Sequence, residues 1–69
     1  MKIQVEDIKM GYMFLAFDFE DRKWYRTLVT QVDGKFLTLA DIDPLSPFMG
    51  MEWLANIEEL QDVNEYKAL

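Results

Sequence analysis

Apolar and aromatic residues are concentrated in three runs within the first two thirds of the chain. The runs cover residues 12–19, 24–32 and 36–42, and they are rich in the aromatic and β-branched residues that favour strands. A charged segment at residues 20–23 separates the first two runs, and Asp33-Gly34 separates the second from the third. This pattern predicts a meander of strands with short connections, the first hairpin having a four-residue loop.

Asp33-Gly34 is the strongest turn signal in the sequence. Both central residues of a type I′ turn need positive φ, and an Asp-Gly pair suits that requirement. With these two residues as the loop, Arg26 lies opposite Asp41, and such an opposite-charge pair stabilises a sheet. We therefore predict a hairpin in this register, and a further short strand at residues 3–5 before the meander.

The segment after residue 42 is less regular. Pro44 and Pro47 have no N–H group to donate to a strand ladder, so residues 43–47 are predicted to form a loop. Beyond Gly50 the apolar spacing fits one face of a helix. It also fits a fourth strand containing Phe48, Met49 and Met51, then a 3₁₀ turn at residues 55–57, then a closing strand at 60–63.

We favour strand, turn and strand for this region, because a four-stranded sheet alone would leave one face poorly covered. Residues 64–69 are expected to form a frayed tail. The prediction is a single domain over residues 1–69, mainly β, folded as a small five-stranded SH3-like barrel. A short 3₁₀ or α-helical turn is expected near the C-terminus.

Two segments, residues 8–17 and 20–29, resemble a Tudor domain. They contain a Gly at position 11, a hydrophobic run with Ala16, an acidic loop and then Trp24-Tyr25-Arg26. Residues 39–43 fall where that family has its Phe-Ile-Asp-Tyr-Gly strand, and the similarity extends over residues 8–60.

Tudor domains bind methylated arginine or lysine in an aromatic cage through cation–π attraction. The resemblance places Tyr25 at a cage position and the first aromatic of the cage at Phe17 or Asp18. The later corner of the cage falls on residues 43–45, which supply no aromatic ring.

Charge is unevenly distributed along the chain. The net charge is −6, yet residues 1–35 carry six acidic and six basic residues, so the excess lies in the second half. An acidic surface repels phosphates and attracts basic proteins, so we expect a protein partner with a basic surface and no direct nucleic-acid binding. Homodimer formation is a further possibility.

Several function classes are disfavoured by composition. The chain has no cysteine and no histidine, and its three glycines are isolated. Cys/His zinc sites, Ser-His and Cys-His catalytic pairs and Gly-rich phosphate-binding loops are therefore missing. We expect a protein that is not an enzyme and that has no cofactor or metal.

The first residues contain no apolar signal-peptide core, and the apolar runs are too short to span a bilayer, so a cytoplasmic protein without membrane contact is expected.

The favoured function is a protein-interaction module that uses an apolar patch flanked by carboxylates. Five methionines and ten aromatic residues are many for so small a core, so some apolar area should face a partner. The predicted partner-binding residues are the apolar anchors and their flanking carboxylates: Tyr25, Phe48, Met49, Met51, Trp53, Asp41, Asp43, Glu58 and Glu59. The alternative is an inhibitor, of the kind that small phage or plasmid proteins often are. Its carboxylates would mimic nucleic-acid phosphates and block a DNA- or RNA-binding protein.

Overall fold

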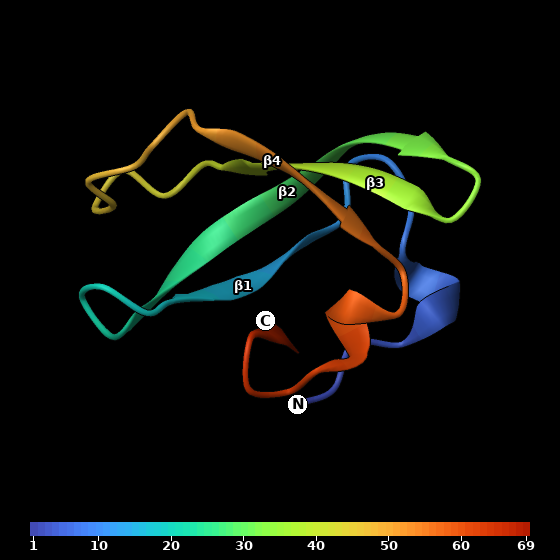
Figure 1. The fold of residues 1–69 in the computed structure, drawn as a ribbon, viewed down its shortest axis with the longest axis horizontal. Coiled ribbons are helices and arrows are strands. Elements are labelled where there is room, and N and C mark those ends of the chain that lie inside the picture. Colours follow the sequence, from blue (N-terminus) through green and yellow to red (C-terminus); the bar gives the residue numbers. More distant parts are fainter.

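A computed structural model describes residues 1–69. Five strands form one antiparallel sheet with the order β4-β3-β2-β1-β5 (Figure 1). The elements in chain order are η1 (Val5–Asp7), β1 (Met13–Asp18), β2 (Lys23–Asp33), β3 (Phe36–Asp41), β4 (Glu52–Asn56), η2 (Glu59–Gln61) and β5 (Tyr66–Ala68). The prediction of a mainly β domain with five strands and a short 3₁₀ turn near the C-terminus is confirmed.

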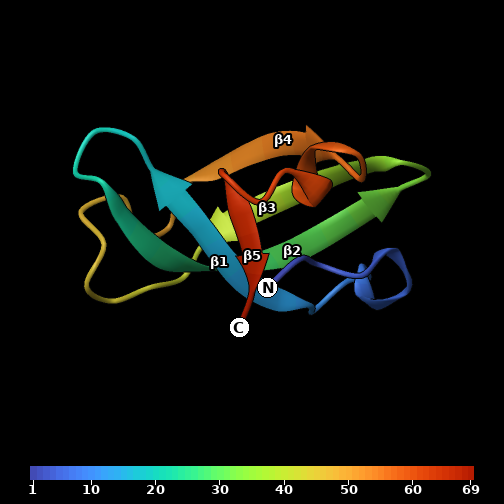
Figure 2. The same ribbon diagram turned by 90° about the horizontal axis from the view of Figure 1, so that it is seen from below.

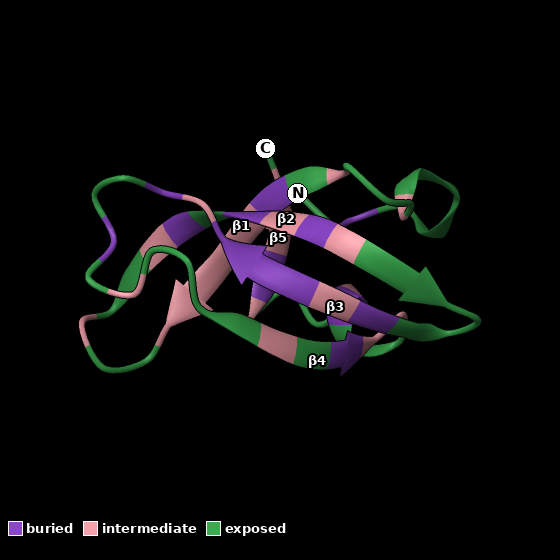
Figure 3. Ribbon diagram, turned by 90° about the horizontal axis from the view of Figure 1, so that it is seen from above, coloured by how far each residue is buried: buried purple, intermediate pink, exposed green.

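The core fills the concave side of this curved sheet. Because alternate side chains of a strand point to opposite faces, Phe14, Val29, Leu37, Leu39 and Ala55 all point inward from the four meander strands. Figure 1 shows β2, β3 and β4 on one side and the C-terminal segment with η2 on the other. In Figure 3 the buried residues are concentrated on β3 and the middle of β2.

The two chain ends close the core from the other side. Ile3, Leu60 and Tyr66 are buried against the strand residues. Figure 2 shows β5 beside β1, with the N-terminal segment next to it. The N–H of Ala68 donates to the carbonyl of Met1 at 2.7 Å.

The predicted hairpin after residue 32 is present, but its loop lies one residue later than predicted, so Val32 faces Leu37 and not Lys35. Asp33 pairs with Phe36, so the loop is Gly34-Lys35, and only Gly34 has positive φ (+60°). Gly at the first loop position with an ordinary residue after it fits a type II′ turn better than type I′. A β-bulge around Thr30 then shifts the pairing again, so Thr27, and not Arg26, faces Asp41.

The predictions for the chain ends also need correction. Residues 3–5 form no strand, although Ile3 is buried, and residues 48–50 form a turn that precedes β4. The 3₁₀ turn lies at η2 and not at residues 55–57, where β4 ends, and the closing strand is β5 rather than residues 60–63.

Residues 66–68 are therefore not frayed. Tyr66 is 9% exposed, its ring meets Phe14 edge-on at 5.8 Å, and its hydroxyl accepts a hydrogen bond from Trp53 Nε1 at 3.2 Å. These contacts hold the tail against β1.

Candidate functional site

The concave side of the sheet is open at one end. Two loops lie at that end: residues 19–22 between β1 and β2, and residues 42–51 between β3 and β4 (Figure 1). The inward rows of the strands continue past the core into this space, where they end in a groove of about 380 Å³. The groove therefore has a floor of strand residues and walls made by loops.

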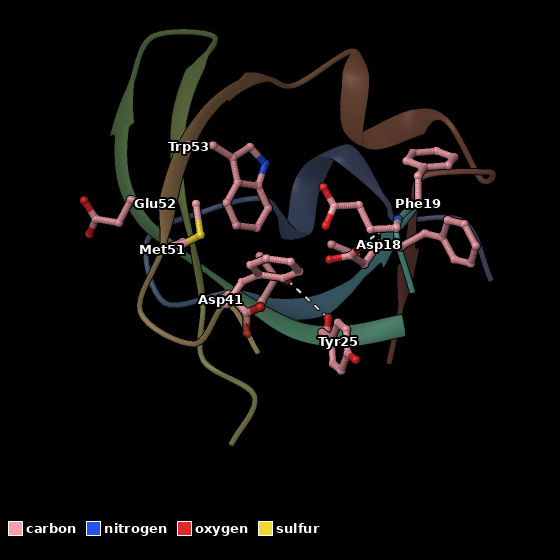
Figure 4. Close-up of a pocket in the computed structure, with 12 residues that line it drawn as sticks. Asp18, Phe19, Tyr25, Asp41, Met51, Glu52 and Trp53 are labelled. Atoms are coloured by element: carbon pink, nitrogen blue, oxygen red, sulfur yellow. Dashed lines mark hydrogen bonds between the residues drawn. The ribbon is translucent and has the colours of Figure 1, made fainter. Parts of the chain in front are cut away.

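Aromatic residues are frequent in the lining of the groove: Phe17, Phe19, Tyr25, Phe48 and Trp53. The Phe17 ring packs on Trp24 at 5.2 Å on the outer face of the sheet, and in Figure 4 Phe19 points away from Trp53 and Tyr25. The hydrogen bond from Trp53 Nε1 to Tyr66 orients the indole. The rings available to a ligand are therefore those of Tyr25, Phe48 and Trp53.

Four carboxylates lie among the lining residues: Asp18, Glu20, Asp41 and Glu52. The twelve lining residues include no lysine or arginine. Asp18 accepts hydrogen bonds from the N–H groups of Glu20 (2.8 Å) and Asp21 (3.3 Å), so it shapes the first loop. The side chains of Glu20 and Glu52 are exposed and have no hydrogen-bond or ion-pair partner; in Figure 4 Glu52 points away from Trp53. Glu20 is therefore the carboxylate best placed to meet a cation in the groove.

Asp43 holds the second loop against β2. Its carboxylate accepts hydrogen bonds from the N–H of Arg26 and of Leu45, each at 3.0 Å, and lies 3.7 Å from Arg26 Nε. The Arg26 N–H, followed by the Leu45 N–H, lowers the pKa of the Asp43 carboxyl from its ordinary value of 3.8. This carboxylate is a structural anchor for the loop.

Asp41 also stabilises the β3–β4 loop, through hydrogen bonds within it. It is 6% exposed and accepts hydrogen bonds from the Asp43 N–H at 3.0 Å and from the Ser46 hydroxyl. Ser46 Oγ in turn accepts the N–H of Phe48 at 3.0 Å. The backbone of the loop at Phe48 is therefore held by a chain of polar contacts.

Replacing Asp43 with asparagine should remove part of the pH dependence of stability. Because the pKa of Asp43 is lowered on folding, its carboxylate stabilises the fold above pH 3.8 and loses that effect as pH falls through the folded pKa. Asp43→Asn should be less stable than the parent near pH 7 and should lose less stability on acidification. Urea unfolding between pH 2 and 7 measures this. Asp33→Asn, at the exposed end of β2, is the matched control, and an unchanged acid slope in Asp43→Asn would contradict the anchor.

Tyr25 fixes the first loop in a comparable way. It is 7% exposed, and its hydroxyl donates to the Asp21 carboxylate. This hydrogen bond, with burial second, raises the pKa of Tyr25 to about 12. The pKa values of Tyr12 and Tyr66 are also raised, mainly by burial.

The tyrosines should therefore ionise late in the folded protein. A raised tyrosine pKa stabilises the fold below the ordinary value of 10.0, and this effect is lost as pH rises through the folded pKa, near 12 for Tyr25. Tyrosinate absorbance at 295 nm should stay low at pH 10 in the native protein and be half developed there in urea. Tyr25→Phe should remove the latest native step; three tyrosines that ionise near pH 10 in the folded state would contradict this description.

The groove brings together part of the predicted site. Tyr25, Asp41, Phe48, Met51 and Trp53 all line it. The other four predicted residues do not: Asp43 is the loop anchor, Met49 is exposed beside the groove, and Glu58 and Glu59 lie at the turn into η2.

Phe19, Glu20 and Glu52 were missed by sequence reasoning. In the sequence, Phe19 ends an aromatic run and Glu20 begins a charged segment, and neither feature indicates a site. Their role becomes visible once the β1–β2 and β3–β4 loops are known to face the same end of the sheet.

No group of three or more acidic side chains is arranged to hold a metal ion. The structure contains no helix with the length and apolar character needed to cross a membrane. No protein-family model, curated protein or solved structure matches this chain.

Proposed function

We propose that this protein is a non-catalytic interaction module of the cytoplasm. Its groove takes a cationic side chain, lysine or arginine, from a basic segment of a protein partner. The observation that carries this proposal is the lining of the groove: the rings of Tyr25, Phe48 and Trp53, the unpaired carboxylate of Glu20, and no lysine or arginine. The curled five-stranded antiparallel sheet also supports the interpretation of the fold as a small SH3-like barrel.

The chemistry of lysine and arginine matches this lining. Each side chain has an apolar stem that packs on rings and a cationic head that is attracted to π-faces and carboxylates. Trp53, Tyr25 and Phe48 supply the rings, and Glu20 supplies an unpaired carboxylate. A volume of about 380 Å³ lies in the range of pockets that hold small ligands.

The overall charge supports the same partner. The net charge of −6 arises in the second half of the chain, which contributes the β3–β4 loop, β4 and η2. An acidic surface raises the encounter rate with a basic protein, and the effect weakens as salt is added.

The phosphate-mimic alternative is less well supported. It requires the carboxylates of the second half to lie in exposed rows. Asp41 and Asp43 are 6% and 7% exposed, and both are engaged in hydrogen bonds within the β3–β4 loop. They are therefore withdrawn from any surface that a nucleic-acid-binding protein would contact.

The proposal is tested with acetyl-Gly-Lys-Gly-amide and acetyl-Gly-Arg-Gly-amide as probes. A Trp24→Phe background leaves Trp53 as the sole indole, so its fluorescence reports on the groove. Both probes should change the Trp53 emission in a saturable way. Absence of any saturable change with either probe would contradict the proposal.

Charge reversal at the groove should weaken binding of these probes by about fivefold to tenfold. Glu20→Lys places a like charge where the cationic head sits. Glu6→Lys makes the same change in net charge on exposed η1, outside the groove lining, and serves as the matched control. Equal losses in the two variants would show that only overall charge matters.

A further inference from the structure

The outer edge of β4 carries backbone groups without partners. In an antiparallel ladder, alternate residues of an edge strand bond to the neighbouring strand and the others point outward. The bonds from Asp41 N to Met51 O (2.9 Å) and from Ile57 N to Lys35 O (3.0 Å) show that odd-numbered residues of this segment face β3. The N–H and C=O groups of Glu52, Leu54 and Asn56 therefore point away from the sheet.

The opposite edge of the sheet is closed. On β5, the N–H groups that face away from β1 are already used: Ala68 N donates to Met1 O at 2.7 Å, and Tyr66 N donates to Asp62 O at 2.9 Å. Figure 3 shows β4 running along the free border of the sheet. The molecule thus has one open edge.

The open edge also lacks the features that usually protect such strands. Proline, a bulge or an inward-pointing charge commonly blocks strand addition. β4 contains no proline, and the bulge of this sheet lies in β2. The central side chain of β4, Leu54, is 79% exposed. Beside Leu54, Phe36 on β3 is 58% exposed on the same outer face.

The open edge is continuous with the groove. Met51 and the first two residues of β4, Glu52 and Trp53, line the groove, so a strand laid along β4 passes its mouth. Side chains of the added strand would alternate between the two faces. Those beside Trp53 would meet the groove, and those beside Leu54 would meet the exposed apolar face.

Charge indicates the kind of segment that fits. Glu52 lies on the edge itself, and Glu58 and Glu59 follow it at the start of η2, all exposed and none in an ion pair. A second copy of this chain would bring the same acidic groups together. A basic and apolar segment avoids this repulsion: its apolar side chains would lie beside Leu54, and its basic side chains would alternate onto the groove face, where Glu20 is unpaired.

We infer that β4 receives an extended basic segment of the partner as an added strand. The backbone of that segment bonds to Glu52, Leu54 and Asn56 while one of its basic side chains enters the groove. This inference rests on the proposed function, and it adds how the partner's backbone is recognised.

The probe is acetyl-(Lys-Val)3-Lys-amide, and the protein is left unchanged. An added strand uses the N–H groups of alternate residues only. Two modified peptides are compared, one N-methylated at the three valines and one at three of the lysines. One of the two should bind about tenfold or more weakly than the unmodified probe, and the other should keep its affinity. Loss in the valine series indicates antiparallel addition, and loss in the lysine series indicates parallel addition.

A protein variant gives an independent test. Leu54→Pro removes one outward N–H without touching the β3–β4 ladder, and edge strands tolerate proline at such positions. Leu54→Thr keeps the N–H and is the matched control. Binding of the unmethylated probe should fall about tenfold in Leu54→Pro relative to Leu54→Thr.

The outcomes separate the two proposals. If the probe changes the Trp53 emission but neither N-methylation nor Leu54→Pro changes its affinity, binding in the groove is supported and strand addition is overturned. If the probe does not bind at all, both are overturned. If sedimentation shows a dimer that Leu54→Pro dissociates, the edge pairs with a second copy and the assignment to a basic segment is wrong.

Discussion

Phe14→Ala is expected to leave most of the chain unfolded at 25 °C. The Phe14 ring is fully buried at the centre of the core, against Tyr66 at 5.8 Å and Tyr12 at 5.7 Å. Truncating a buried phenylalanine costs about 3–5 kcal/mol. A core of this size supplies a net stability of roughly 3–5 kcal/mol, and the chain has no disulfide to add to it.

Circular dichroism and urea unfolding measure this effect. Leu45→Ala removes a side chain of similar character that is 84% exposed, so it should change the stability by less than about 0.5 kcal/mol. A folded Phe14→Ala variant with a urea midpoint near that of the parent would contradict the described core.

Phe48→Ala is expected to cause the largest loss of probe binding, about tenfold to thirtyfold. Phe48 forms an aromatic wall of the groove from the β3–β4 loop, yet it is outside the core cluster. Its removal should therefore affect the ligand more than the fold. Aromatic anchors in pockets commonly contribute about 2 kcal/mol to binding.

Met49→Ala is the matched control for this prediction. Met49 is adjacent in sequence, 59% exposed and outside the groove lining. Fluorescence titration with acetyl-Gly-Arg-Gly-amide compares the two variants. A loss of the same size in Met49→Ala would move the binding surface from the groove to the outside of the loop.

Two adjacent residues of β2 hold both walls of the groove. Tyr25 binds the Asp21 carboxylate in the β1–β2 loop through its hydroxyl, and the Arg26 N–H binds Asp43 in the β3–β4 loop at 3.0 Å. The spacing of the walls is thus set by one rigid strand. Preorganisation of this kind reduces the entropy lost when a ligand binds.

The strands were predictable because their residues carry the signal. Aromatic and β-branched runs mark β1, β2 and β3, and the turn residues mark their ends. Register was not predictable, because it depends on whether Asp33 or Gly34 begins the loop and on a bulge at Thr30 that no residue type announces.

The C-terminal segment was misjudged for a related reason. Residues 64–69 are short and partly polar, so local propensity predicts fraying. The burial of Tyr66 and its contacts with Phe14 and Trp53 hold the segment as β5. These contacts join residues far apart in the chain, and sequence periodicity cannot detect them.

The site was predictable to a similar extent. Large aromatic residues near the prolines identified Phe48 and Trp53. The sequence gives no indication that Asp43 anchors a loop, because that role depends on the Arg26 N–H of a neighbouring strand. It also gives no indication that Glu20 and Phe48 line the same groove, because they come from two separate loops.

The central claim is that the groove recognises positive charge on an apolar stem. Two probes that differ only in that charge test it most directly: acetyl-Gly-Lys-Gly-amide and its norleucine counterpart, titrated against the ¹⁵N-labelled protein by NMR. The lysine probe should shift the Trp53 indole N–H and the amides of Phe48 and Glu20 in a saturable way, and the norleucine probe should shift them far less. Equal shifts with both probes, or shifts confined to residues outside the groove, would contradict the claim.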